Sequence, residues 1–169
     1  MVDSISGLFT GEEKLEERKI NGVKLIYLIT RVDDRGDLVE NWRKSWNLLP
    51  GNVSQVYTVH NPRRDVIRAY HKHDELWDLF SIINGSAKFR LKDGREKSPT
   101  FEMTDEMILG VRKPGLLVVP PGVYHGWMSL EDNTILLSIA SHEYNREKPD
   151  EYRIPFDSFG ADKWNIKPR

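Results

Sequence analysis

The sequence predicts a mainly β protein, an antiparallel sandwich or barrel such as a jelly roll, formed by one domain. Three observations carry this prediction. From Val53 onward, short strand-like runs follow one another, and Gly, Pro, Asn or Asp separates most of them. No helical periodicity lies between these runs, so neighbouring strands are expected to pair directly, as in antiparallel sheets. The chain of 169 residues also has the length of a single domain.

The N-terminal third is expected to form an arm over about residues 1–20, followed by a strand. The arm is charged in its GEEKLEERK segment, and the apolar run VKLIYLITRV follows a turn signal at Asn21-Gly22. The segment NWRKSWNLLPG is compatible with two structures. It forms either a short helix that ends at Pro50-Gly51, or a single buried patch around Trp42 and Trp46.

Seven short strands are predicted in the rest of the barrel. In chain order they are SQVYTVH, DVIRAYH, LWDLFSIING, AKFRLKDG, LLVVPPG, HGWMSL and TILLSIASH. A polar, proline-bearing tail then covers about residues 146–169. We expect this tail to pack over the barrel rather than extend it.

Composition excludes several classes of protein and site. The net charge of −1 gives no reason to expect binding to nucleic acid. The absence of cysteine excludes disulfides, thiolate metal sites and cysteine nucleophiles. The N-terminus is too polar for a signal peptide, and no apolar run approaches the roughly 20 residues of a membrane span. We therefore expect a cytoplasmic protein with no membrane partner.

One predicted strand carries a His-Lys-His sequence. Side chains two residues apart on a strand point to the same face, so His71 and His73 can meet one ligand. With Asp78 and Gly85 they match the first cupin motif, H-x-H-x(3,4)-E-x(6)-G, with Asp in the place of Glu. The second motif, G-x(5)-P-x-G-x(2)-H, is matched with one residue fewer in its first gap, by Gly115, Pro120, Gly122 and His125.

The two motifs resemble those of the cupin fold, a double-stranded β-helix in which they converge on a metal. The resemblance implies one cupin domain over residues 1–169, with short helices and the C-terminal tail. It also implies a metal site formed by His71, His73, Asp78 and His125. Imidazoles with one carboxylate suit a divalent transition metal, namely Fe, Mn, Ni, Cu or Zn. The same residues are equally compatible with a cupin that binds no metal.

A narrower resemblance, to the dTDP-4-dehydrorhamnose 3,5-epimerase family, extends from Gln55 to Tyr144. The family's G-V-L-R-G-L-H strand corresponds to DVIRAYH, its D-x-R-x-x-S-P-T-F to DGREKSPTF, and its I-P-x-G-x-x-H-G-F to VPPGVYHGW. Its closing D-P-x-x-x-x-x-W is similar to FDSFGADKW. The resemblance implies a homodimeric enzyme that takes a nucleotide-linked 4-keto sugar as substrate.

The family resemblance also implies roles for individual residues. His71 takes the place of the base that removes the proton next to the keto group. Tyr144 falls on a tyrosine that closes over the sugar and is a candidate proton donor, with Tyr124 as an alternative. Arg68, Arg95 and His125 are expected to bind substrate, since guanidinium groups bind phosphate well.

Three positions depart from the family pattern. Asp78 replaces a lysine that steadies the enolate, and a carboxylate there would repel it. Ser138 replaces the catalytic tyrosine, and no counterpart follows Trp164 for the aspartate that partners the base. We therefore expect a His71 without its usual partner, and a metal at Asp78 that replaces the lysine as a Lewis acid.

Three functions follow from these observations. The first is a divergent, metal-assisted epimerase or isomerase that acts on a dTDP-4-keto-6-deoxyhexose-like nucleotide sugar. The second is a metal-dependent cupin of another chemistry, such as an oxygenase. The third is a non-catalytic cupin that binds a sugar or a nucleotide.

Overall fold

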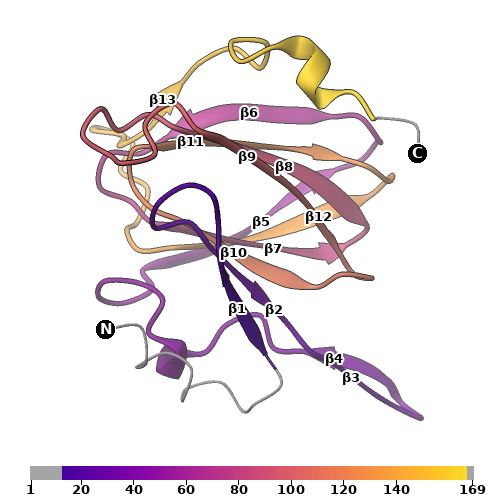
Figure 1. Cartoon of the computed structure of the whole chain (residues 1–169). Helices are drawn as coiled ribbons and strands as arrows, with labels where there is room; N and C mark the ends of the chain where they lie inside the picture. Colours follow the sequence, from indigo (N-terminus) through magenta and orange to yellow (C-terminus); the bar gives the residue numbers. More distant parts are fainter. Residues whose placement is uncertain (1–12, 167–169) are drawn as a thin grey trace.

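Two antiparallel sheets face each other around the core of the protein (Figure 1). The structure is a computed structural model, and it describes residues 13–166. One sheet has six strands, in the spatial order β1 (Lys14–Glu17), β2 (Lys24–Tyr27), β10 (Gly115–Val119), β7 (Asp78–Asn84), β12 (Thr134–Ala140) and β5 (Gln55–Asn61). The other has five, in the order β13 (Tyr152–Arg153), β6 (Ile67–Lys72), β11 (Val123–Ser129), β8 (Ser86–Asp93) and β9 (Thr104–Gly110). The predicted mainly β fold is confirmed.

Each of the seven predicted strands is present, but three further strands of the two sheets, within the described range, were not predicted. These are β1, which lies in the expected arm, β13, which lies in the tail, and β9, the longest of the three. The strand β9 is the one that the sequence pattern did not reveal within the barrel. Its alternation is hard to see in the sequence because the acid Asp105 points inward with Met107 and Leu109, while Ile108 is exposed. Arg18 explains the buried acid, because its Nε donates a hydrogen bond of 2.8 Å to Asp105 Oδ2. A buried ion pair therefore occupies a position where an apolar residue would have revealed the strand.

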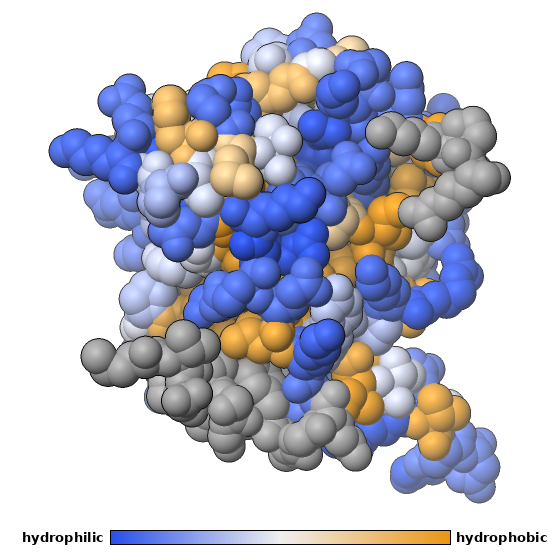
Figure 2. Space-filling view, viewed as in Figure 1, coloured by the Kyte–Doolittle hydropathy of each residue, from blue (hydrophilic) through white to orange (hydrophobic). Residues whose placement is uncertain are grey.

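The expected N-terminal strand is divided into two. β2 ends at Tyr27, and the chain then leaves the sheet and forms a hairpin of β3 (Thr30–Asp33) and β4 (Gly36–Val39). Figure 1 shows this hairpin projecting from the body of the protein. Apolar side chains lie on it in Figure 2, at the lower right, where Val32 and Leu38 are 75% and 57% exposed. Of the expected arm, residues 1–12 lie outside the described part.

The tryptophan-rich segment forms a buried patch rather than a regular helix. Only a 3-10 turn, η1 (Lys44–Trp46), is present, and it ends at Asn47 in the left-handed conformation with φ of 50°. Trp46 is buried, and Trp42 packs against the same apolar cluster on the outer face of the six-stranded sheet. None of the helices between residues 13 and 166 is long and apolar enough to cross a membrane.

The C-terminal tail covers the outer face of the five-stranded sheet. The tail contains a 3-10 helix, η2 (Ala161–Trp164), which buries Trp164 against Tyr70, with ring centroids 5.5 Å apart. The prediction that the tail packs over the barrel is confirmed, although β13 also extends the sheet by two residues beside β6. Figure 1 shows the tail running along β6 in yellow. This path brings residues 150 and 151 to His71 on β6 and to His73 directly after it.

Candidate active site

A bulge in β6 places Arg68 and His71 on the same face of the sheet. His71 is paired with His125 on β11, and Arg68 with Trp127, so two residues on β6 between these pairs oppose one on β11. Without the extra residue, a spacing of three would put the two side chains on opposite faces. The face that they share points into the barrel, where Trp127 belongs to the core between the sheets.

Gly126 permits this bulge. A Cβ atom at this position would lie 2.3 Å from Ala69 Cβ and 2.9 Å from the Arg68 carbonyl oxygen. No side chain tolerates contacts this short, so the glycine of the His-Gly-Trp sequence lets β6 approach β11.

His71 has a carboxylate partner, contrary to the expectation from the sequence. Its Nδ1 lies 2.6 Å from Glu151 Oε1, and Arg153 donates a second hydrogen bond of 2.9 Å to the same carboxylate. Burial alone would raise the pKa of Glu151, but the hydrogen bonds from Arg153 and His71 outweigh it and lower the pKa. An ionised Glu151 only accepts hydrogen bonds, so it holds a proton on Nδ1 of His71 and leaves Nε2 as the nitrogen that can accept another proton.

The missed partner comes from the tail. Arg153 on β13 is paired with His71 on β6, and Glu151 directly precedes β13. The carboxylate that the sequence was not expected to supply thus reaches the histidine from another point in the chain. The one signal in the sequence was an Asp-Glu pair directly before a short β-prone segment, which does not by itself identify a partner strand.

His73 is also oriented by the tail. Its Nδ1 hydrogen-bonds the backbone carbonyl of Asp150. The carboxylate of Asp150 in turn accepts hydrogen bonds of 2.8–2.9 Å from the backbone N–H groups of Asp74, Glu75 and Leu76. Burial would raise the pKa of Asp150, but these N–H groups lower it. Residues 150 and 151 therefore fix both imidazoles of the His-Lys-His sequence.

His73, Asp78 and His125 form a compact buried group. Asp78 Oδ2 lies 3.3 Å from His73 Nε2 and 3.5 Å from His125 Nε2, and the candidate ligand atoms all lie within 4.8 Å of one another. His125 Nδ1 is 3.1 Å from the Val123 carbonyl. In both His73 and His125, Nδ1 therefore hydrogen-bonds a backbone carbonyl, and Nε2 points to the Asp78 carboxylate.

The charges in this group are set by burial and by Asp78. Burial lowers the pKa of His125 to about 4, so this imidazole is neutral near pH 7. Burial acts in the same direction on His73, but the hydrogen bond and charge of Asp78, together with those of Asp150, outweigh burial and raise the pKa. Two imidazoles and one carboxylate form a donor set for a transition metal, and carbonyl-bound Nδ1 atoms are the usual outer support of such ligands. His71, the fourth predicted ligand, lies outside this group.

Arg95 is part of a buried network in the loop after β8. Its guanidinium donates hydrogen bonds of 2.7 and 2.8 Å to Asp93, and a third of 2.7 Å to the Asn21 carbonyl. Ser98 and Thr100 donate two more to Asp93, at 2.6 and 2.7 Å. The D-x-R-x-x-S-P-T sequence therefore has a structural role in this fold, and the predicted contact of Arg95 with a diphosphate stays a prediction.

The remaining predicted residues are Arg68, Tyr144 and Tyr124. Arg68 Nε donates a hydrogen bond of 2.7 Å to Asn61 Oδ1 at the end of β5. Tyr144 is 58% exposed, and its backbone N–H donates to Gln55 Oε1 at the start of β5. Tyr124 packs against Phe159 in the outer cluster under the tail, with ring centroids 5.5 Å apart, so it is not a proton donor to the interior.

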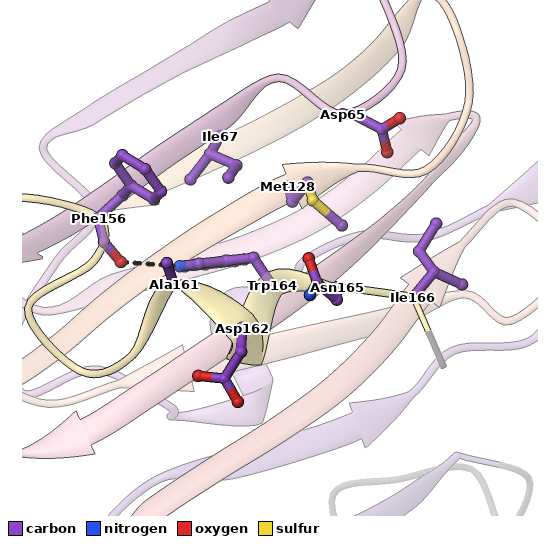
Figure 3. A pocket seen from close by; sticks show the side chains of 9 residues that line it. All are labelled: Asp65, Ile67, Met128, Phe156, Ala161, Asp162, Trp164, Asn165 and Ile166. Carbon is purple, nitrogen blue, oxygen red and sulfur yellow. Dashed lines mark hydrogen bonds between the residues drawn. The ribbon is translucent and has the colours of Figure 1, made fainter. Parts of the chain in front are cut away.

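A separate hollow lies on the outer face of the five-stranded sheet, beside Trp164 (Figure 3). Trp164 Nε1 donates a hydrogen bond of 2.9 Å to the Phe156 carbonyl across it. Ile67 and Met128 form its floor from β6 and β11. None of the predicted site residues lines this hollow, so the candidate chemistry belongs to the barrel interior.

Comparisons with known proteins agree with the motifs. The family model described as dTDP-4-dehydrorhamnose 3,5-epimerase matches residues 17–164. The chain is 37% identical over 139 residues to the spore coat polysaccharide biosynthesis protein SpsL of Bacillus subtilis, covering 82% of this chain and 91% of SpsL. It is 26% identical over 148 residues to TDP-4-oxo-6-deoxy-alpha-D-glucose-3,4-oxoisomerase of Aneurinibacillus thermoaerophilus, covering 86% of this chain and 91% of that enzyme.

A solved structure shows the same fold. The dTDP-4-dehydrorhamnose 3,5-epimerase of Bacillus anthracis, determined with TDP and PPi bound, superposes with a TM-score of 0.81 at 23% identity, over 92% of both chains. The predicted cupin fold is confirmed by this similarity. The chain belongs to the dTDP-4-dehydrorhamnose 3,5-epimerase family of sugar-nucleotide epimerases and isomerases.

Proposed function

We propose that the protein epimerises or isomerises a dTDP-4-keto-6-deoxyhexose, and that His71 is the base. The observation that supports this proposal is the pair formed by His71 and Glu151, with 2.6 Å between Nδ1 and Oε1. Among the described residues, none hydrogen-bonds His71 Nε2, so this nitrogen is available to a substrate proton. A hydrogen next to a ketone is acidic enough for an imidazole to remove when the enolate is stabilised.

The same first step serves both reactions. His71 takes the proton from the carbon next to the 4-keto group, and the C–H electron pair enters the enolate. Return of a proton to that carbon from the opposite face inverts it, whereas return to C4 of an enediol shifts the ketone to C3. The changes at Asp78 and Ser138 favour reaction at one centre over a double epimerisation, and the oxoisomerase relative illustrates the second outcome.

Deuterium exchange tests this proposal directly. TDP-4-oxo-6-deoxy-α-D-glucose is incubated with the protein in D₂O, and NMR follows the hydrogens at C3 and C5 together with new products. Wild type is expected to exchange at least one of these positions, and His71→Asn to lose the exchange. His60→Asn is the matched control, because His60 lies on β5 and contacts Asn133 rather than the site. Absence of exchange by the wild type would disprove the proposal.

We further propose that a divalent transition metal binds His73, Asp78 and His125. Two imidazole nitrogens and a carboxylate oxygen converge there. The other nitrogen of each imidazole already hydrogen-bonds a backbone carbonyl. A metal at this point would polarise the sugar carbonyl as a Lewis acid, in the place where the family resemblance implies the positive charge of a lysine. The residues of this chain hold the ligand atoms in place and keep water from the buried carboxylate.

Elemental analysis of protein purified without chelator tests the metal. We expect about one equivalent of Fe, Mn, Ni, Cu or Zn in the wild type and none in a His73→Ala/Asp78→Ala double variant. His142→Ala, which removes an imidazole that contacts Ser141, should retain the metal. Metal-free wild type with full exchange activity would exclude a metal role and leave the base chemistry of His71 intact.

We also propose that the protein is a cytoplasmic homodimer that associates through its projecting hairpin. An isolated two-stranded hairpin is only marginally stable in water, and this one exposes Val32 and Leu38. A second copy of the chain would cover these residues in a two-fold interface. The cytoplasm is the expected location because a charged nucleotide sugar does not cross a membrane unaided.

A further inference from the structure

We propose that Tyr57 is the acid that returns the proton to the substrate, from the sheet opposite His71. This inference rests on the proposed epimerase or isomerase function and names a residue for its second half. Tyr57 belongs to β5, at the edge of the six-stranded sheet, whereas His71 belongs to the five-stranded sheet. A substrate between the two sheets would meet the two side chains on opposite faces, which is what inversion of a carbon requires.

The register of β5 and β12 identifies Tyr57. Tyr57 is the direct partner of Ser138 on β12, and Ser138 is in turn the partner of Phe80 on β7. By the family resemblance, Ser138 stands at the position of the catalytic tyrosine. Direct partners in adjacent strands share a face, so the phenol lies on the inner face with Phe80, whose ring is 5.3 Å from that of His125. The phenol lost at Ser138 is therefore present one strand away.

Ser138 itself is a poor proton donor. Its side chain is fully buried, and its Oγ has no hydrogen-bond partner among residues 13–166, although the Tyr57 hydroxyl is near enough to interact with it electrostatically. A buried serine hydroxyl neither reaches the substrate space nor gives up its proton near pH 7. Tyr57 is 43% exposed and is therefore accessible from solvent.

The electrostatic surroundings keep the phenol protonated. Burial raises the pKa of Tyr57, and the negative charges of Asp78 on β7 and Glu151 in the tail raise it further, against the opposite effect of the Ser138 hydroxyl. The Tyr57 hydroxyl is thus within electrostatic reach of the carboxylates that serve the histidines. A protonated phenol at this point can deliver its proton to the enolate carbon and leave a phenolate, while His71 retains the proton that it removed.

Both groups are reset through water after the product leaves. His71 releases its proton and the Tyr57 phenolate takes one up, so the cycle is balanced without a co-reactant. Tyr144 is the competing donor. Its backbone N–H donates a hydrogen bond to the side chain of Gln55, two residues before Tyr57. Tyr144 is, however, more exposed to solvent than Tyr57.

The test separates proton removal from proton return. In D₂O, Tyr57→Phe should still exchange the substrate hydrogen through His71, within about threefold of the wild-type rate. New product should form at least about 100-fold more slowly, because a general acid typically contributes a factor of 10² to 10⁴. Tyr124→Phe, which removes a hydroxyl from the outer cluster, is the matched control and should retain both rates.

Other outcomes overturn the inference. If Tyr57→Phe forms product at the wild-type rate, the acid is another group, and loss of product in Tyr144→Phe would identify it. Parallel loss of exchange and product in Tyr57→Phe would also refute a role confined to proton return. Failure of the proposed function itself is distinguishable, because the wild type would then show no exchange.

Discussion

His71 and Glu151 are 80 positions apart in the chain, yet a hydrogen bond of 2.6 Å joins their side chains. β13 brings them together by pairing with β6 directly beside the histidine. The tail of the protein is therefore part of the candidate active site and more than a cover for the barrel.

Replacement of Glu151 by Gln should slow the reaction without unfolding the protein. The amide still accepts a hydrogen bond from Nδ1, but it no longer stabilises the imidazolium that forms when His71 takes a proton. We expect the turnover rate to fall about 10- to 100-fold, with a smaller change in KM. Steady-state kinetics checks this expectation, with the exposed Glu143→Gln as control. An unchanged turnover rate would show that Glu151 has no part in proton transfer.

Asp93→Asn should destabilise the fold in a pH-dependent way. Burial opposes ionisation of Asp93, but hydrogen bonds from Arg95, Ser98 and Thr100 outweigh it and hold the pKa far below its ordinary value. The ionised form therefore stabilises the folded state above the unfolded-state pKa of about 3.9, and this contribution is lost as the pH falls.

Urea unfolding at several pH values measures this effect. At pH 7 the Asn variant should be less stable than the wild type by about 2 kcal/mol, since it loses charged hydrogen bonds. The difference should shrink as the pH falls below about 4, because Asp93 of the unfolded wild type then takes up a proton while the folded carboxylate stays ionised. The exposed Asp157→Asn is the control, and a difference that did not vary with pH would contradict the argument.

Gly126→Ala should disrupt the bulge that places Arg68 beside His71. The new methyl group would lie 2.3 Å from Ala69 Cβ, so β6 has to move away from β11. Overpacking of this kind costs about 1–3 kcal/mol, and we expect a lower Tm together with a loss of activity larger than the stability change explains. A variant with wild-type Tm and activity would show that the strands separate without cost.

The projecting hairpin should govern the oligomeric state. Wild type is expected to sediment as a dimer of 19.7 kDa chains, and a Val32→Glu/Leu38→Glu variant as a monomer. Charges at these positions would oppose burial of the hairpin face against a second copy. Arg35→Ala, at the exposed turn of the same hairpin, should remain dimeric. A wild-type monomer in analytical ultracentrifugation would refute the proposal.

Much of this protein is determined by its sequence alone. The short alternating runs predicted most of the barrel strands, and the spacing of the two motifs identified His73, Asp78 and His125, which gather in the interior. These features are local, because the period of a strand decides which neighbours share a face. The family motifs added His71 as the candidate base.

Only the tertiary structure decided how these residues are supported. The bulge at β6 depends on the approach of β11, and Glu151 reaches His71 because a short strand after a long loop pairs with β6. Tyr57 faces the space beside Ser138 through a register between strands that are far apart in the chain. A sequence pattern reports which side chains lie on one face of a strand, whereas the partner across the barrel depends on long-range packing of the whole chain.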